Sequence, residues 1–496
     1  MDSVRELARI AGGLLLVPAV AAGVVALTSA IVFQDFLSAG VFSLLSAIPL
    51  LIAWMSSSVS AAPRSDSLAV KSGGVAAAWI IASVVCAIPF QAVAHLSTEQ
   101  NSTLETLRSP LDAVYESTSS LSSSGLTVCP KSSELPPALQ LWRSLLQWIG
   151  GVGLAVFALL ILESAELGRS LYRAETRSWQ PTQGVQSTVK LLLMIYGSLT
   201  VACGIAFCFC QMPLWEAINH CLIICSTGGL TVTDDSFTSY NAPTKCVAVL
   251  FMVLAAVPFS MFVILPRDGL KMLLRRDALI AFVGWVALLS VCLILDYFLF
   301  GTVANGTWFN LISAISTCGV NDGDLEGYPT ATSCVFIIAM FVGACGDSTA
   351  GGFKVNRLWW SLKISAHEFA QNLGVAGKDT FPRWNGSEAE ADEAQQRTRR
   401  TLVVFTIFSA AHTIGFVALR MIYSAQVGSD RILFQTTSAL SAVGLSMGLS
   451  GADRPAAAKL VEIALMLAGR LEVLALILLA AVAVRACLPS KVEPTG

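Results

Sequence analysis

A four-residue pattern, Ser-x-x-Gly, occurs four times along the chain, each time in a moderately polar stretch between two apolar runs. Glycine permits backbone angles that expose carbonyl oxygens, and carbonyl oxygens can replace the water around a dehydrated cation. One copy would be a weak signal, but four copies in equivalent places predict four parts of one ring. These predicted filter segments are Ser122, Ser123, Ser124 and Gly125; Ser226, Thr227, Gly228 and Gly229; Ser316, Thr317, Cys318 and Gly319; and Ser441, Ala442, Val443 and Gly444.

The composition of the 496 residues requires a membrane. Apolar residues make up 55% and charged residues only 13%, whereas a soluble domain carries about 25% charged residues. Apolar runs of roughly 20 residues recur, which is the length that crosses a bilayer. We expect an all-α membrane protein, because a helix satisfies its own backbone polar groups inside lipid. Ten spans are predicted near residues 10–33, 40–58, 72–94, 140–163, 186–211, 243–265, 277–300, 331–360, 401–424 and 456–486.

The positions of the filter segments divide the spans into repeats. One segment lies between the third and fourth, fifth and sixth, seventh and eighth, and ninth and tenth spans. We therefore predict two leading transmembrane helices followed by four helix–pore loop–helix repeats around a pseudo-fourfold pore. The expected parts are the leading helices (1–70), pore repeat 1 (71–165), pore repeat 2 (166–266), pore repeat 3 with an intramembrane loop (267–384), a cytoplasmic linker (385–400) and pore repeat 4 (401–496).

The charges predict the orientation of the chain. Clusters of Arg and Lys fall at the N-terminus, at the C-terminus and after every second span, beginning with Arg5 and Arg9. Such clusters mark the cytoplasmic side, so both termini are expected there. The first apolar run is too long for a cleaved signal and is predicted to be a membrane helix. The opposite side carries acids that would concentrate cations, namely Asp234, Asp235, Asp322, Asp324 and Glu326.

Two features inside the apolar spans are unusual. Residues 343–352 interrupt the eighth span with four glycines and Asp347. A Gly-Asp-Ser sequence in this stretch could suggest a serine hydrolase, but such chemistry needs a nearby base, and none of the four histidines is expected there. We predict that the chain is not an enzyme. Arg470 is isolated in the tenth span, where a guanidinium costs at least about 2.5–3.5 kcal/mol and should face a partner in the interior.

Four longer motifs carry a family resemblance. They are Trp142–Gly151 (WRSLLQWIGG), Glu216–His220 (EAINH), Ser348–Lys354 (STAGGFK) and Gly469–Glu472 (GRLE). In combination they resemble the Trk/Ktr/HKT superfamily of potassium transporters, and the TrkH branch in particular. The resemblance implies a channel-like potassium uptake subunit in a bacterial cytoplasmic (inner) membrane. It further implies potassium as the bound ion, no organic cofactor, membrane lipid around a homodimer, and a cytosolic nucleotide-binding ring of the TrkA type; no nucleic acid partner is expected.

The resemblance also implies a gate below the filter. In the family an intramembrane loop obstructs the pore until activation; the matching stretch here could instead be a plain structural kink. Relatives usually carry a small residue where Asp347 stands, so we predict an Asp347–Arg470 ion pair that closes the pathway. The alternative is that Asp347 caps its own loop. The expected gate residues are Gly346, Asp347, Ser348, Thr349, Gly351, Gly352, Lys354 and Arg470, although Lys354 could also extend to the membrane interface.

Other cation transport mechanisms stay open at this stage. HKT sodium carriers are known for a Ser at the first filter glycine, and Gly125 stands here, which favours potassium. No copy contains Thr-Val-Gly, so sodium transport or weak monovalent selectivity is an alternative. An ion-coupled secondary transporter is a further alternative, although that class usually has two inverted repeats with broken helices.

Overall fold

The computed structural model describes residues 14–58, 68–162, 184–300, 306–375, 377, 380–385, 387–388, 391–471, 476 and 479. Within these ranges the fold is helical except for one antiparallel pair of two-residue strands, β1 (Arg383–Trp384) and β2 (Ser387–Glu388). Five described helices are long and apolar enough to cross a membrane: Leu16–Phe33, Ser72–Leu96, Lys190–Phe209, Asp277–Phe298 and Ala391–Ile422. The predicted all-α membrane class agrees with these helices.

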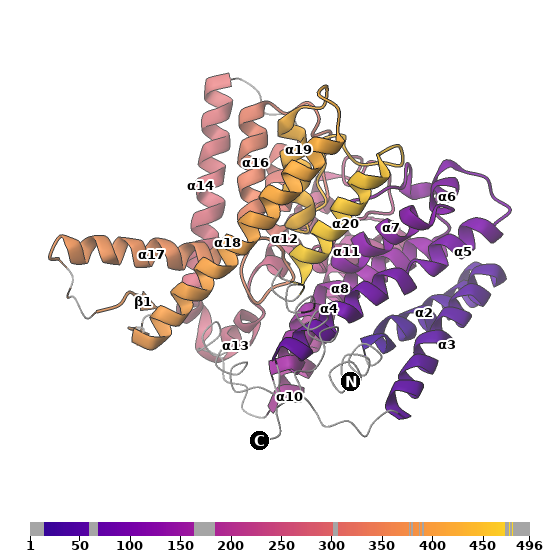
Figure 1. Ribbon diagram of the computed structural model, residues 1–496, viewed down its shortest axis with the longest axis horizontal. Coiled ribbons are helices and arrows are strands. Elements are labelled where there is room, and N and C mark those ends of the chain that lie inside the picture. The colour runs from indigo at the N-terminus through magenta and orange to yellow at the C-terminus, as the bar shows by residue number, and fades with distance from the viewer. Residues whose placement is uncertain are drawn as a thin grey trace, which may run out of the picture.

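The two leading helices lie at one edge of the molecule (Figure 1). Helix α2 (Leu16–Thr28) continues through a π-helical turn, η1 (Ser29–Phe33), and then reverses into α3 (Phe36–Ser58). Gln34 makes this reversal in a left-handed backbone conformation with φ 52°. Helix α2 packs on both α3 and α8 (Pro137–Leu162), so the pair is attached to the first inner helix.

Most of the other described helices fall into four groups that follow the predicted repeats, and we label the members of each group the outer, pore and inner helix. The outer helices are α4 (Leu68–Val85) with α5 (Ile88–Leu96), α10 (Gly184–Phe209), α14 (Asp277–Phe300) and α18 (Ala391–Ile422). The pore helices are α7 (Pro110–Ser122), α11 (Leu214–Cys225), α15 (Thr307–Ser316) and α19 (Ser429–Leu440). The inner helices are α8, α12 (Ala242–Ala256), α16 (Thr330–Val342) and α20 (Ala456–Arg470).

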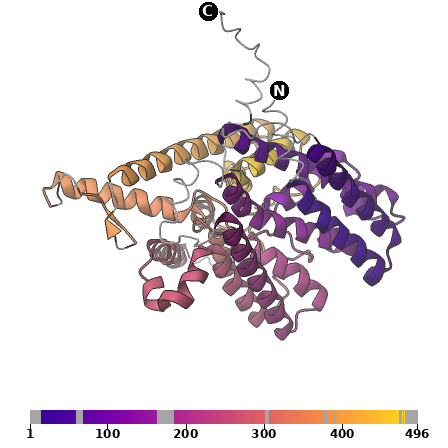
Figure 2. The ribbon, with the colours of Figure 1, turned by 90° about the horizontal axis from the view of Figure 1, so that it is seen from below.

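Pore and inner helices alternate around a closed ring. In order, α7 packs on α8, α8 on α11, α11 on α12, α12 on α15, α15 on α16, α16 on α19 and α19 on α20. Helix α20 packs back on α7, which closes the ring. From below, the chain colours follow one another around the molecule until yellow comes to lie beside indigo (Figure 2). This arrangement places the C-terminal ends of all four pore helices near one centre.

Local sequence sets the start of several helices. Ser109 accepts a hydrogen bond from the main-chain N of Asp112 and Pro110 occupies the first turn of α7. Asn241 caps α12 in the same way, again with a proline behind it. A polar side chain satisfies a free N–H of the first turn, and proline there has no N–H to satisfy. Two short elements lie within repeat 1: α6 (Ser102–Leu107) precedes α7, and η2 (Ser132–Glu134) lies between α7 and α8.

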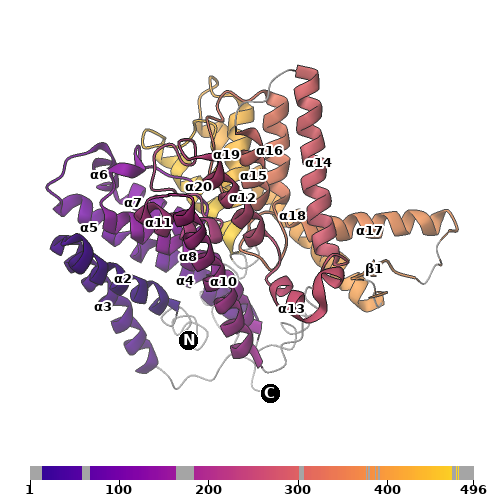
Figure 3. The ribbon, with the colours of Figure 1, turned by 180° about the vertical axis from the view of Figure 1, so that it is seen from behind.

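Two of the predicted spans are sharply broken within the described residues. Residues 331–360 divide into α16 and α17 (Val355–Asn372), and α17 projects sideways from the helical bundle (Figures 1 and 3). The break begins at Gly343, whose φ of 67° ends α16. The span at 243–265 bends by 96° between α12 and α13 (Ser260–Leu273), where Pro258 cannot continue a helix.

The predicted linker is also shorter than expected. Residues 391–400 belong to α18, so this helix begins ten residues before the predicted ninth span. The β1–β2 hairpin and the end of α17 precede it. The predictions about both termini, Arg5 and Arg9 concern positions outside the described residues, and so does Glu472 at the end of the GRLE motif.

Candidate functional site

The four pore helices end in the same backbone motif. The third residue of each predicted filter segment donates its N–H to the carbonyl five residues earlier, at 2.9–3.0 Å. The second residue of each segment adopts a left-handed conformation, with φ between 52° and 57°. This combination is a Schellman cap, and it turns the chain sharply at each helix end. The four bonds run from Ser124 to Ser119, Gly228 to Ile223, Cys318 to Ser313 and Val443 to Ser438.

The four segment glycines lie against one another in a ring. All have positive φ, from 75° at Gly125 to 102° at Gly444. A Cβ built on Gly125 would lie 3.0 Å from the Cα of Gly444, and one on Gly229 would lie 3.2 Å from Gly125 and 3.3 Å from Gly319. A Cβ on Gly319 would lie 3.1 Å from the Cα of Gly444. Only glycine fits these contacts and backbone angles.

Carbonyl oxygens lie close to each glycine of this ring. The oxygen of Gly228 lies beside Gly125, that of Cys318 beside Gly229, that of Val443 beside Gly319 and that of Ser124 beside Gly444. Each belongs to the residue before a ring glycine and lies against the glycine of another repeat. The C-terminal ends of the pore helices also direct negative partial charge toward this point. A ring of oxygens with negative helix ends behind it favours a cation.

The loop that interrupts the eighth span, residues 343–354, packs directly against the ends of the pore helices. Thr349 donates its hydroxyl to the carbonyl of Cys225 at 3.3 Å, and Gly351 donates its N–H to the hydroxyl of Thr317 at 2.6 Å. A Cβ on Gly351 would lie 1.9 Å from the carbonyl oxygen of Ser441. The loop therefore contacts pore segments of repeats 2, 3 and 4.

Arg470 connects this loop with repeat 1. The side chain is buried, with 4% exposure, and donates to the carbonyls of Thr349 at 3.1 Å and Gly151 at 2.9 Å, as well as to that of Gly150. Its two terminal nitrogens donate to backbone oxygens of the loop and of α8. A planar guanidinium with several donors suits such a cluster of carbonyls.

The predicted Asp347–Arg470 ion pair is wrong for this structure. Asp347 instead accepts hydrogen bonds at the start of α13, through its carbonyl from the N–H of Phe259 at 2.8 Å and through its carboxylate from the N–H of Ser260 at 3.4 Å. These two bonds do not correspond to the predicted alternative either. That alternative was a cap on the loop of Asp347 itself, whereas both bonds reach a different helix. A carboxylate near the free N–H groups at the start of a helix is electrostatically favourable, which accounts for the position of the Asp347 side chain.

The other predicted gate residues stabilise the shape of the loop. Gly346 donates its N–H to Asn356 at 2.9 Å, and Ser348 donates its hydroxyl to the carbonyl of Cys345 at 2.7 Å. Gly352 has φ 79°. Lys354 begins α17 and donates to the carbonyl of Ala350, so its amine turns back toward the loop.

The predicted cation-attracting acids have different surroundings. Asp322 pairs with Lys245 at 2.8 Å, so its charge is compensated. Asp234 accepts from the N–H of Ser133 at 2.9 Å and from its hydroxyl at 2.6 Å.

A further acid near these loops, Glu216, accepts a hydrogen bond from the hydroxyl of Tyr240. Burial, and secondly the Glu216 carboxylate, raise the pKa of Tyr240, so its hydroxyl stays neutral and donates. A cavity of about 470 Å³ adjoins these groups, lined by Ser133, Gln140, Trp215, Glu216, Val232, Thr233, Asp234 and Asp235.

Comparison with known proteins decides the family. The TrkH family, described as cation transport proteins, matches residues 46–274 and 286–487. The chain belongs to the TrkH family. It is 28% identical over 417 residues to the Trk system potassium uptake protein TrkH of Salmonella typhimurium, covering 81% of this chain and 83% of that protein. It is 29% identical over 389 residues to TrkH of Halomonas elongata, covering 75% and 78%.

The fold of this TrkH family member matches a solved relative. The crystal structure of the potassium transporter TrkH from Vibrio parahaemolyticus superimposes with a TM-score of 0.79 at 23% sequence identity, covering 96% of this chain and 98% of that one. The family resemblance predicted from the four motifs is thereby confirmed, and the protein is a membrane cation transporter by family.

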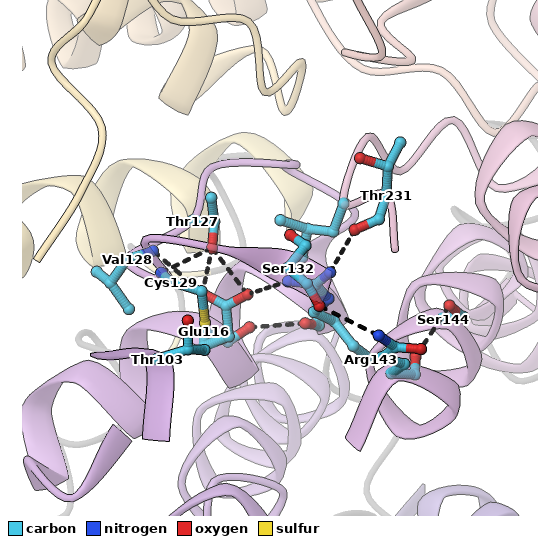
Figure 4. A network of polar contacts seen from close by, with 12 residues as sticks. Thr103, Glu116, Thr127, Val128, Cys129, Ser132, Arg143, Ser144 and Thr231 are labelled. Atoms are coloured by element: carbon cyan, nitrogen blue, oxygen red, sulfur yellow. Dashed lines mark hydrogen bonds and ion pairs between the residues drawn. The ribbon is translucent and has the colours of Figure 1, made fainter. Parts of the chain in front are cut away.

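A buried charged pair that the sequence motifs did not indicate lies behind the first filter segment of this TrkH family member (Figure 4). Glu116 on α7 and Arg143 on α8 lie 3.0 Å apart, and both side chains are fully buried. Arg143 also donates to the carbonyl of Thr231, in the loop after the second segment. Glu116 could have been suspected, because it is the last charged residue before a filter segment and an acid so close to the segment needs a buried partner.

Proposed function

We propose that this chain is a potassium uptake subunit that conducts ions in a channel-like way through the ring of four filter segments. The observation that carries the proposal is the convergence of the four glycines and the carbonyl oxygens before them. Carbonyl oxygens can take the place of the hydration shell of potassium. Uptake would be driven by the membrane potential, which supplies about 2.3 kcal/mol per charge per 100 mV.

The proposed gate is the loop 343–354 with Arg470. Three observations support this role: the loop lies against the ends of pore helices, it is rich in glycine, and a buried cation holds it to α8. A positive charge next to the pathway opposes the passage of cations. Opening would require the loop to move and Arg470 to change partners.

The proposed setting follows the relatives. Several of them are named as parts of a Trk system, which supports a multi-subunit assembly. We propose a homodimer in a bacterial inner membrane with both termini in the cytoplasm, regulated by a cytosolic nucleotide-binding ring of the TrkA type. In this proposal potassium is the transported ion and the chain itself holds no organic cofactor.

Growth of a potassium-uptake-deficient bacterium tests the proposal. Expression of the chain should restore growth at low potassium, and the Gly319→Ala variant should not, because a Cβ there would lie 1.7 Å from the carbonyl oxygen of Val443. Failure of the membrane-inserted wild-type chain, together with its regulatory partner, to restore growth would reject potassium uptake.

Currents recorded from reconstituted protein separate the alternatives. A reversal potential that follows the potassium gradient supports the proposal, and equal permeability to sodium supports weak selectivity. Absence of unitary currents combined with flux that depends on a second ion would support a coupled transporter.

A further inference from the structure

The structure reveals a second fourfold pattern behind the filter segments. A buried polar residue stands six positions before the serine of each segment, and all four have 0% exposure. Buried polar groups are costly unless they form hydrogen bonds. Four such residues in one register therefore point to a common task. They are Glu116, His220, Asn310 and Gln435.

Two of these side chains bind equivalent backbone N–H groups, each just after the ring glycine of its own repeat. Glu116 accepts from the N–H of Val128 at 3.1 Å, and Asn310 accepts from the N–H of Asp322 at 2.7 Å. Val128 and Asp322 each lie three residues after their ring glycine. The pore helix thus fixes both ends of the segment, through its Schellman cap before the glycine and through this side chain after it.

The equivalent residues of repeats 4 and 2, Gln435 and His220, make different contacts. Gln435 accepts from the hydroxyl of Ser446, two residues after Gly444, at 2.9 Å. His220 contacts the rings of Phe237 and Tyr240 edge-on, with centroids 5.1 Å and 5.6 Å away. In repeat 2 the N–H that follows the ring glycine, that of Leu230, is held instead by the side-chain oxygen of Gln147 on α8, at 2.9 Å.

Glu116 is the charged member of the set. Besides Val128, it accepts from the hydroxyl of Thr127 at 2.9 Å and from Arg143 at 3.0 Å (Figure 4). Arg143 reaches in turn to the carbonyl of Thr231. One carboxylate thus links the chain after Gly125 with the chain after Gly229. Hydrogen bonds to an ionised acceptor are the stronger kind, so this corner of the ring is held firmly.

We propose that Glu116 is a positioning residue for ion selection, which it influences by fixing the segment that carries the Ser124 carbonyl. The inference rests on the proposed function. Discrimination between potassium and sodium requires that the ring oxygens keep their spacing or number when the smaller ion enters. Replacing Glu116 with Gln removes the charge, leaves Arg143 without its charged partner and puts an NH2 group where one acceptor oxygen was. The first segment would then relax around sodium.

Reversal potentials of reconstituted protein between potassium and sodium solutions test the inference. Glu116→Gln should raise the sodium-to-potassium permeability ratio by about fivefold or more, the factor expected for one unsatisfied buried group. The matched control is Glu134→Gln, which removes one carboxylate from the exposed loop between α7 and α8, where Glu134 pairs with Lys131. The control should keep the wild-type ratio.

The outcomes separate the inference from the proposed function. A wild-type chain without selective potassium current rejects the function itself. A selective wild-type chain together with a conducting Glu116→Gln variant of unchanged ratio rejects only the role of Glu116. If Glu116→Gln fails to reach the membrane, Thr127→Val decides instead, because it removes one hydroxyl that donates to Glu116. That variant should shift the ratio in the same direction, and an unchanged ratio would overturn the inference.

Discussion

Arg470 donates a hydrogen bond to the backbone carbonyl of Thr349, and this contact ties the last inner helix to the loop below the glycine ring. The same guanidinium also binds the carbonyls of Gly150 and Gly151. One side chain thereby joins α20, the loop and α8. A backbone carbonyl has no net charge, so the positive charge of Arg470 is not neutralised by these partners.

Arg470→Met should raise resting cation flux. The change removes both a positive charge and the bonds that hold the loop; such charge-assisted bonds contribute about 1.5–3 kcal/mol each, so we expect an increase on the order of tenfold. Rubidium uptake into liposomes that contain the protein without any regulatory partner measures it. Arg420→Met, at the end of α18, serves as the control. Equal flux in wild type and Arg470→Met would show that the arginine does not hold the pathway closed.

Gly125→Ser should increase sodium permeability relative to potassium. A side chain at this position would lie 2.6 Å from the carbonyl oxygen of Gly228 on a backbone with φ 75°, so the ring must shift. The shift in reversal potential under bi-ionic conditions measures the effect. Gly327→Ala is the control, because a Cβ there meets nothing within 4 Å. An unchanged reversal potential in Gly125→Ser would count against the ring as the selective element.

Asp234→Asn and Asp322→Asn should respond differently to salt. Asp322 is paired with Lys245, so its loss acts mainly on local structure and should reduce uptake equally at all ionic strengths. Asp234 is held by the neutral Ser133, so its charge can attract cations over a distance. Because screening is strong beyond about 10 Å at 0.1 M salt, Asp234→Asn should reduce uptake most at low salt. Potassium uptake measured in a series of ionic strengths distinguishes the two, and identical salt profiles would contradict this assignment.

Lys459→Met should destabilise the protein more than the double change Asp112→Leu with Lys459→Met. Lys459 and Asp112 form a buried ion pair between α20 and α7, where repeat 4 meets repeat 1. Removing one partner leaves a buried charge and costs about 3–5 kcal/mol, whereas removing both costs much less. Thermal unfolding in detergent measures the difference. Lys131→Met, which breaks an exposed pair, should have little effect; a double variant as unstable as the single one would refute the argument.

The sequence predicted the membrane class and the places of the four segments because those features repeat and depend on local composition. It also predicted the break in the eighth span, because glycines such as those in residues 343–352 destabilise a helix. The Asp347–Arg470 pair failed for a different reason. Two buried charges in one region suggest a pair, but the backbone carbonyls of Gly150, Gly151 and Thr349 were equally able partners. Every residue has a main-chain oxygen, so a sequence does not show which of these oxygens will accept a hydrogen bond from Arg470.

The register of Glu116, Asn310 and Gln435 lay within reach of the sequence, because each stands at the same distance from its serine. Their side chains differ in type, so a search for identical residues passes over them. Their common role became visible only through the atoms that they contact after the glycines.

The glycine ring is built by a single chain, and this has a consequence for how its preferences can change over generations. One altered codon modifies one quadrant and leaves three as they were. In an assembly of four identical subunits the same mutation would strike every quadrant at once. Ser124, Gly228, Cys318 and Val443 already differ from one another at the equivalent position. The ion preference of the ring can therefore change in small steps. At each step the three unchanged segments preserve most of the ring's function.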